Sequence, residues 1–474
     1  MDVSVIIPVY NNREEFERSL YFLSKQQVRE SLAYEVIVVD DGSSEPIRQI
    51  AEKYQSKLPN LRYIYLERTP DSNRSRTRNT GIQASTGSKL LFLDCGILVP
   101  PNYVESVAGL LEGRPELVLL HYILGLFAEV NENEADDILR LTPESFEQFC
   151  DKMKYTANWE DYRAVSFESV QNDLDQLPAP WVLGWSGALS TSRELVSRTD
   201  GFDESFREWG AEDIDFSYQL YRNGGSFQAT EHIKTLHLPH EVTNNDENKM
   251  RSSLRNKFKI HQKNGDFDTE LYPFCADMYY NQLMGKYNRL LTKYFTPTYS
   301  ESLMNELNTR YLSNGEGRSL LVGSDSHSVI QTLQTTHVFL QNKSIYEAYS
   351  QTFKDKNIVY ALGINTFYEK HFFDVAIMTD YYRMSSLPML LFMFKELLRI
   401  SGKLVVIHTE DHHCFESGAG WLTWDQVTPF LRNYGFTFEK VEQSGRHSIM
   451  EITSSVSLQR MSTADLLTVY YMSL

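Results

Sequence analysis

The sequence has few cysteines, no long apolar run and no excess of positive charge. Its cysteines, Cys95, Cys150, Cys275 and Cys414, are scattered without a Cys-x-x-Cys pair, so we expect neither a disulfide framework nor a zinc site. The apolar run LPMLLFMF is far too short to cross a bilayer and ends at Lys395. The first residues, MDVSVIIPVY, are typical of a strand rather than a signal peptide. These absences predict a cytoplasmic protein with reduced thiols.

The charge balance excludes one class of partner. The 474 residues include 46 lysines and arginines against 63 aspartates and glutamates, which gives a formal net charge of -17. Nucleic-acid binding requires a positive surface, so we expect no nucleic-acid partner, although a single nucleotide needs only one local pocket. The hydrophobic content of 42% and aromatic content of 13% are typical of well-packed globular domains. The length predicts two or three of them.

Apolar runs alternate with helix-like segments at the start of the chain. The runs are VSVIIPV, YEVIVV, LRYIY and KLLFL. This order predicts a parallel sheet with right-handed crossovers. Ligands bind such sheets at the carboxyl ends of the strands. We therefore expect functional residues directly after each run, at 8–11, Asp40, Asp41 and Asp94.

A second alternating unit follows later in the chain. Residues 116–176 are aromatic, acidic and less regular, and we interpret them as an insertion that shapes a pocket. The second alternating unit contains the apolar runs SLLVGS, THVFLQ, NIVYALG, FDVAIMTD and GKLVVIHTE. These runs predict five strands with helices between them. The sequence therefore predicts the α/β class, with a first domain at 1–265, a helical linker at 266–315 and a Rossmann-like domain at 316–474.

The stretch WGAEDID at 209–215 places three carboxylates within four residues. Like charges this close repel unless a cation, a hydroxyl or a proton transfer uses them. Aspartate and glutamate also favour the first turn of a helix, so a solvated acidic helix start is the plain alternative.

Five segments together resemble the family two glycosyltransferases of the GT-A fold, over about the first 260 residues. They are VSVIIPVYN, VVDDGS, RNTGIQASTG, FLDCG and GFDESFREWGAEDIDFSYQLYRNG. The last also resembles a segment shared by β-1,4-galactosyltransferases and chondroitin-polymerase-type enzymes. The resemblance implies an inverting hexosyltransferase that moves a sugar from a UDP-sugar to a hydroxyl of a glycan, peptide or protein acceptor.

The resemblance also implies a donor nucleotide site. Its residues would be Pro8, Val9, Tyr10, Asp41, Arg74, Arg78 and Asp94. The first three would form a wall beside the base, and the Asp41 carboxylate would accept a hydrogen bond from the uracil N–H. Asp40 suits this role less, because one of the pair should face the sheet edge. Plainer interpretations also fit: DDGSS suits a turn with a helix cap, and both arginines suit a solvated surface.

In WGAEDID the resemblance assigns chemistry to single residues. Asp213 aligns with the general base that takes the proton from the acceptor hydroxyl, and its negative neighbours would raise its pKa. Glu212 would hold the acceptor, with Trp209 stacked against a sugar face and Trp185 also on the acceptor side. Asp215 is expected to cap or support the helix.

The metal motif departs from the family. FLDCG keeps Asp94 but has Cys95 and Gly96 where the family continues to a second acid, so a divalent cation would lose an oxygen ligand. The resemblance implies Mn²⁺ or Mg²⁺ held by Asp94 and one histidine of LHLPHEV, either His237 or His240. A weakened metal site and a non-catalytic sugar-nucleotide-binding module are the alternatives.

The second unit loosely resembles a class I methyltransferase fold. Its cofactor turn keeps only Gly323, and Gln341 stands where an acid should hold the ribose. We therefore expect a domain without methyltransferase activity that serves acceptor recognition or homo-oligomer formation. The alternative is a bifunctional glycosyltransferase and S-adenosylmethionine-dependent methyltransferase. His412 and His413 are expected in a surface loop.

Overall fold

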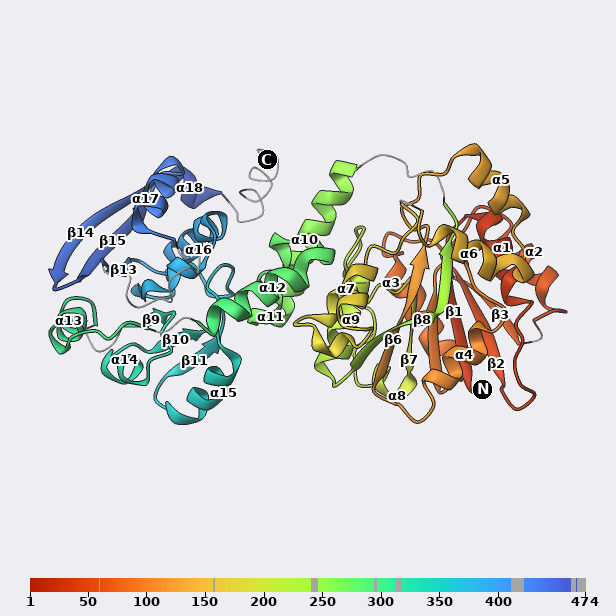
Figure 1. Cartoon of the computed structure of the whole chain (residues 1–474), viewed down its shortest axis with the longest axis horizontal. Helices are drawn as coiled ribbons and strands as arrows, with labels where there is room; N and C mark the ends of the chain where they lie inside the picture. Colours follow the sequence, from red (N-terminus) through yellow and green to blue (C-terminus); the bar gives the residue numbers. More distant parts are fainter. Residues whose placement is uncertain are drawn as a thin grey trace. The chain divides into compact units, whose positions relative to one another are not determined.

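The computed structural model describes residues 1–58, 60–156, 158–239, 246–293, 296–312, 317–410, 422–461 and 466. Its internal contacts divide the chain into unit 1, Met1–Asn256 with Asp277–Asn281, and unit 2, Lys257–Ala276 with Gln282–Leu474. Each unit contains one β-sheet accompanied by helices (Figure 1). The predicted α/β class with two sheets is confirmed, whereas the predicted boundaries at 265 and 315 stay predictions.

Unit 1 is built on an eight-stranded sheet with the order β3-β2-β1-β4-β7-β6-β8-β5. Its strands are β1 (Val3–Val9), β2 (Tyr34–Asp40), β3 (Leu61–Tyr65), β4 (Lys89–Leu93), β5 (Ile97–Leu98), β6 (Leu117–Leu124), β7 (Ala188–Ser192) and β8 (Ser226–His237). Strands β1 to β4 pair in parallel, as their alternation with helices predicts. β7 is antiparallel to both of its neighbours, β4 and β6. The carboxyl ends of the parallel strands therefore share one edge.

One core strand lies where the sequence predicted an irregular insertion. All eight residues of β6 are buried. Its sequence, LVLLHYIL, is apolar on both faces and lacks the alternation that marks a half-exposed strand, so periodicity could not distinguish it from a buried helix. The irregular part of the insertion begins only after Leu124.

The chain from Met1 to Asn264 also forms helices, and two of them carry residues of the candidate site. The helices are α1 (Arg13–Leu23), α2 (Ile47–Tyr54), α3 (Arg74–Ala84), α4 (Tyr103–Leu110), α5 (Glu132–Arg140), α6 (Phe146–Met153), α7 (Ala164–Ser169), α8 (Arg193–Val196), α9 (Glu212–Arg222) and α10 (Asp246–Asn264). A Cβ atom at Gly81 of α3 would lie 2.3 Å from Cγ2 of Ile6 in β1. Only glycine allows α3 to approach the sheet this closely, which fixes Arg74 and Arg78 beside the strand ends.

A buried ion pair fastens the loop at 159–163 to the sheet. The side chains of Asp161 and Arg163 are 1% and 0% exposed, and Nη2 of Arg163 lies 2.7 Å from Oδ2 of Asp161. Asp161 also accepts a hydrogen bond from the amide of Ile123 in β6. Arg163 donates to the carbonyl oxygens of His121 and Leu183. Because each charged group has several partners, the pair joins three separate segments.

Unit 2 contains a seven-stranded sheet with the order β11-β10-β9-β12-β13-β15-β14. Its strands are β9 (Ser319–Val322), β10 (His337–Leu340), β11 (Asn357–Tyr360), β12 (Val375–Met378), β13 (Leu404–Thr409), β14 (Phe436–Ser444) and β15 (His447–Ser454). The first five are the strands that the apolar runs predicted, and they pair in parallel. β15 is antiparallel to β13 and β14.

The remaining helices are α11 (Phe267–Glu270), α12 (Asp277–Leu291), α13 (Glu301–Leu307), α14 (His327–Thr332), α15 (Lys343–Thr352), α16 (Leu387–Ile400), α17 (Trp424–Asn433) and α18 (Val456–Arg460). In the described part of the chain, no helix is both long enough and apolar enough to traverse a bilayer. Cys95 and Cys150 are free thiols. The predicted surface-loop residues His412 and His413 lie outside the described residues, as does Cys414.

We predict that Asp161→Ala destabilises unit 1 by about 3–5 kcal/mol, because it leaves the buried charge of Arg163 uncompensated. Urea-induced unfolding followed by tryptophan fluorescence measures the change. Asp137→Ala is the matched control in the same region, since its ion pair with Lys152 is exposed and should contribute less than about 1 kcal/mol. Equal effects of the two substitutions would contradict the structural role assigned to the buried pair.

Candidate active site

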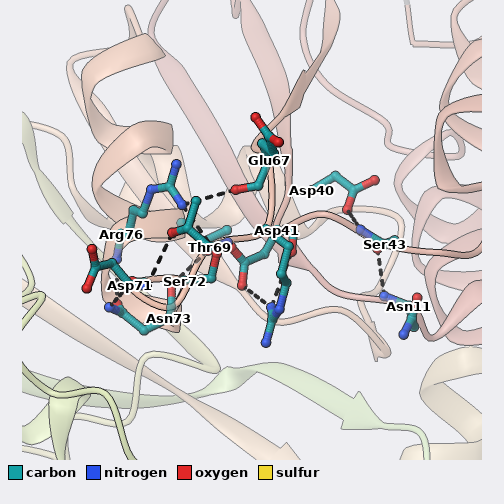
Figure 2. Close-up of polar contacts among 12 residues, drawn as sticks. Asn11, Asp40, Asp41, Ser43, Glu67, Thr69, Asp71, Ser72, Asn73 and Arg76 are labelled. Carbon is teal, nitrogen blue, oxygen red and sulfur yellow. Dashed lines mark hydrogen bonds and ion pairs between the residues drawn. The ribbon is translucent and has the colours of Figure 1, made fainter.

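Asp40 stabilises the turn that follows β2. Its Oδ1 accepts a hydrogen bond from the amide of Ser43 at 2.8 Å, and its Oδ2 accepts one from the Tyr63 hydroxyl at 2.5 Å. The Ser43 hydroxyl in turn accepts a hydrogen bond from the amide of Asn11, just after β1, as Figure 2 shows. Both carboxylate oxygens of Asp40 are therefore used to connect the ends of neighbouring strands.

Asp41, the next residue, has an unused acceptor. The residue is 6% exposed, and its Oδ2 forms an ion pair with Arg68. Its Oδ1 is buried and makes no hydrogen bond within the described residues. Burial raises the pKa of Asp41, and the charge of Arg68 and then the nearby Ser72 hydroxyl oppose this shift. Figure 2 shows the carboxylate of Asp41 in its polar surroundings. A buried acceptor without a partner is a place where a ligand N–H group can bind.

The three residues predicted as a wall beside the base differ in accessibility. Val9 is 2% exposed and belongs to the hydrophobic core, Pro8 is half-buried, and Tyr10 is 47% exposed. The guanidinium of Arg68 lies 3.9 Å from the centre of the Tyr10 ring. Tyr10, Arg68 and Asp41 therefore lie together at the edge where β1, β2 and β3 end.

Arg78 connects two other segments of the site. Its side chain is 4% exposed; Nη2 donates to Oδ1 of Asp94 at 2.8 Å and Nη1 to Oε1 of Glu212 at 3.3 Å. Burial acts to lower the pKa of Arg78, but the charges of Asp94 and Glu212 outweigh it and the net pKa is raised. Arg74 is largely exposed, with Nη1 3.9 Å from the same Glu212 oxygen. The structure thus directs Arg78 toward carboxylates and leaves Arg74 accessible.

A tight backbone turn presents the acidic residues of α9. Gly210 and Ala211 have φ angles of 95° and 68°, and alanine rarely adopts this left-handed conformation. Nδ2 of Asn256 donates to the Gly210 carbonyl at 2.7 Å, and the Ser252 hydroxyl donates to the Trp209 carbonyl. The amino-terminal part of α10 therefore maintains the turn that places Glu212 and the residue after it at the start of a helix.

Asp213 is a carboxyl of this site whose protonation changes near neutral pH. It is half-buried, and its Oδ1 accepts a hydrogen bond from the Ile214 amide at 2.9 Å. Burial and, next, the charge of Glu212 raise the pKa of Asp213 to about 7, while Arg78 opposes the shift. A carboxylate with such a pKa can accept a proton from a substrate hydroxyl near pH 7.

The other residues predicted for this region are placed as follows. Trp209 is 48% exposed, and Trp185 is half-buried with the Arg163 guanidinium 4.7 Å from its ring centre. Asp215 is buried, and its Oδ2 accepts a hydrogen bond from Nε2 of Gln219 one turn along α9. Both tryptophans are accessible to a ligand, whereas Asp215 is within the core.

Two of the three predicted metal ligands lie near each other. Burial acts to raise the pKa of Asp94, but the charges of Arg78, Arg74 and, more weakly, His237 outweigh it, so the net pKa is lowered. Arg78 contacts Oδ1 of Asp94, and Oδ2 lies 3.5 Å from the position that a Cβ atom of Gly187 would occupy. Over the described ranges no three His, Cys, Asp or Glu side chains gather as a metal site would require. His240 lies outside those ranges. Of the predicted metal ligands, the described residues therefore include one carboxylate, that of Asp94, and one imidazole, that of His237.

Two family profiles match the amino-terminal half of the chain. Residues 4–173 match the glycosyl transferase family 2 profile. The amino-terminal part of the chain, called the family 2 domain below, is thus similar to this family. Residues 174–241 match the profile described as the N-terminal domain of galactosyltransferase. This range includes the turn before α9 and α9 itself, which carries Asp213.

Several relatives of the family 2 domain have names that state an activity. Validoxylamine A glucosyltransferase of Streptomyces hygroscopicus subsp. limoneus is 30% identical over 51% of this chain and 52% of its own length. Chondroitin synthase of Escherichia coli is 28% identical over 50% of this chain and 34% of its own length. This chain thus spans about half the length of the first relative. The structure of S. aureus TarS 1-349 with UDP has 20% identity and a TM-score of 0.39 over 65% of this chain and 75% of that one, too low to support an argument.

One residue of the family 2 domain escaped the sequence analysis. Arg68 contacts both Asp41 and Tyr10, yet it lies in the polar stretch LERTPDSNR, in which several charged residues resemble an ordinary surface loop. The usable signal was its position: it follows the third predicted strand, and the carboxyl ends of parallel strands meet at one edge.

We predict that the Asp213 carboxyl titrates near pH 7 and that Glu212→Gln lowers its pKa, since the substitution removes the neighbouring negative charge. Carbon NMR of protein labelled at aspartate carboxyl carbons measures the titration, and the spectrum of Asp213→Asn assigns the signal. Glu208→Gln is the control, because Glu208 is exposed and paired with Arg255. A wild-type titration near 4, insensitive to Glu212→Gln, would contradict the electrostatic account of this site.

Proposed function

We propose that the family 2 domain is an inverting glycosyltransferase that moves a sugar from a UDP-sugar to the hydroxyl of an acceptor. The observation that carries this proposal is the accessible Asp213 carboxylate, with a pKa of about 7, beside the Arg78–Asp94–Glu212 ion-pair network. The names of the relatives, a glucosyltransferase and a chondroitin synthase, support a hexosyl transfer. The acceptor is a glycan, a peptide or a protein.

In this mechanism Asp213 removes the proton from the acceptor hydroxyl as its oxygen attacks the anomeric carbon. The bond between that carbon and the diphosphate oxygen breaks on the opposite face, so configuration inverts in a single displacement. Glu212, whose position is set by Arg78, accepts a hydrogen bond from the acceptor sugar. Trp209 provides an exposed ring against which a sugar face can pack.

The donor would bind at the edge formed by β1, β2 and β3. The unpartnered Oδ1 of Asp41 would accept the uracil N–H, while Tyr10 and Arg68 flank the base. Arg74 is exposed and close to Glu212, so its guanidinium can donate to diphosphate oxygens. Pro8 would contribute to the wall beside the base, whereas Val9 supports it from within the core.

A divalent cation, Mn²⁺ or Mg²⁺, would be held by Asp94 and by His237 or His240, with diphosphate oxygens and water as further ligands. When bound, such an ion neutralises charge on the diphosphate leaving group. Cys95 does not replace the missing acid, because Mn²⁺ and Mg²⁺ prefer oxygen ligands to a thiolate. In addition, burial, followed by the charge of Glu15, raises the pKa of this thiol. We therefore propose a metal site that is weaker than one with two acids.

We propose that unit 2 is a methyltransferase-like domain that does not methylate. Its strand order, with β15 antiparallel beside β13, resembles that of class I methyltransferases and supports this proposal. A Cβ atom at Gly323 would lie 2.1 Å from Cβ of Tyr381, so this side chain fills the space beside the only glycine kept from the cofactor turn. Nε2 of Gln341 donates to the carbonyl oxygens of Phe339 and Ala361 and is not directed toward a ribose. We propose that unit 2 serves acceptor recognition or homo-oligomer formation. This role replaces the alternative of a bifunctional glycosyltransferase and methyltransferase.

We predict that Asp213→Asn lowers kcat for UDP release from UDP-sugars by about a hundredfold or more while UDP affinity changes less than twofold, since the amide keeps the shape and loses the basicity. In the wild type, kcat/KM should fall about tenfold for each pH unit below 7, where the base is protonated. A coupled assay for UDP and calorimetric titration measure the two quantities. Glu208→Gln serves as control, and near-wild-type turnover by Asp213→Asn would exclude Asp213 as the base.

We predict that Asp94→Asn and His237→Ala weaken the binding of Mn²⁺ in the presence of UDP, and that Cys95→Asp strengthens it by restoring an oxygen ligand. Electron paramagnetic resonance of free Mn²⁺ measures this binding without catalysis. His232→Ala is the matched control, because His232 is exposed on the same strand, β8. Identical Mn²⁺ affinities for all five proteins would show that these residues hold no metal.

A further inference from the structure

Two exposed aromatic side chains stack against each other in the insertion that follows β6. Phe127 and Tyr162 are 52% and 38% exposed, and their rings lie 5.0 Å apart with an interplanar angle of 16°. Single exposed aromatic residues are common on protein surfaces. A stacked pair from two separate segments is different, because each ring restricts the other and the outer face of the pair stays exposed to solvent.

The turn that carries Phe127 adjoins the proposed metal and donor edge. The amide of Ala128 donates to the Gly125 carbonyl at 3.2 Å, and the amide of Gly125 donates to the Trp159 carbonyl at 2.9 Å. Gly125 has a φ angle of 76°, and a Cβ atom there would lie 2.9 Å from the carbonyl oxygen of His237. This glycine therefore allows the Phe127 turn to pack directly against the end of β8.

Tyr162 is held from both sides. Its neighbours Asp161 and Arg163 form the buried ion pair, so the backbone at 162 cannot shift without breaking that pair. The Arg163 guanidinium also lies 4.7 Å from the ring centre of Trp185. Trp185 precedes Ser186 and Gly187, and Gly187 adjoins Asp94, so Phe127, Tyr162 and Trp185 all lie on segments fixed beside the site.

We propose that Phe127 and Tyr162, together with Trp185, form an acceptor subsite that binds the apolar face of a pyranose ring. This inference rests on the proposed glycosyltransferase function and specifies a glycan as its acceptor. The face of an aromatic ring carries partial negative charge and attracts the C–H groups of a sugar face. Because the two rings are already stacked, binding costs little side-chain entropy.

The charges next to the pair favour a neutral sugar. Glu129 and Glu160 stand two residues from Phe127 and Tyr162, respectively, and both are exposed. Carboxylates accept hydrogen bonds from sugar hydroxyls, but they repel the carboxylate of a uronic acid. The subsite therefore takes a neutral pyranose in preference to a uronate.

Saturation-transfer NMR on the full chain with UDP tests this proposal. The probes are methyl β-glucoside, methyl β-galactoside, methyl β-N-acetylglucosaminide and methyl β-glucuronide. We expect saturation of the axial ring protons of at least one neutral probe and weaker binding of the glucuronide. The double substitution Phe127→Ala with Tyr162→Ala should weaken the neutral probe about tenfold while the affinity for UDP is kept, and Tyr162→Phe should bind like the wild type.

Tyr155→Ala is the matched control, since Tyr155 is 79% exposed in the same insertion and should not affect binding. Phe127→Leu and Tyr162→Leu replace the double variant if it fails to fold, because they remove a ring and keep apolar volume. Unchanged pyranoside binding in the ring variants would overturn the proposed subsite. The same holds if the wild-type protein cleaves UDP-sugars but binds none of the pyranosides; neither result would contradict the proposed glycosyltransferase function. A change of oligomeric state in the ring variants would identify the pair as a self-association surface and overturn it too. Absence of any UDP-sugar cleavage would instead overturn the proposed function.

Discussion

The buried guanidinium of Arg78 lies between Asp94 and Glu212 and allows these two carboxylates to remain close together. Without Arg78, the negative charges of Asp94, Glu212 and Asp213 would repel one another inside a poorly solvated site. The same cation limits how far the pKa of Asp213 rises, since burial and Glu212 increase it and Arg78 decreases it. A single buried charge thus couples the donor side of the site, at the end of β4, to the acceptor side, at the start of α9.

The position of that cation follows from backbone packing. The approach of α3 to β1, which Gly81 permits, brings Arg78 to the edge where the parallel strands end. The left-handed pair Gly210 and Ala211 turns the chain so that Glu212 meets it there. Local strain at this turn is offset by its hydrogen bonds to α10, and it serves to orient the reactive carboxylates.

Much of this arrangement could be predicted from the sequence, because parallel strands bring residues that follow separate apolar runs to one edge. That rule pointed to Asp41 and Asp94 before any contact was known. It could not find β6, whose uniformly apolar run carries no periodicity, nor Arg68, which resembles any charged loop residue. The pairing of Phe127 with Tyr162 was equally hidden, since it depends on the tertiary contact made by Asp161 and Arg163. The partners of Arg78, two carboxylates rather than a phosphate group, also became visible only in three dimensions.

The central claim is a single displacement at the anomeric carbon with Asp213 as the base. Proton NMR of the first sugar released when the protein cleaves a UDP-α-sugar with water as the acceptor tests it most directly, before the free sugar interconverts between its anomers. The account predicts that the β anomer forms first. Initial formation of the α anomer would mean retention of configuration and would contradict the mechanism, whatever the identity of the natural acceptor.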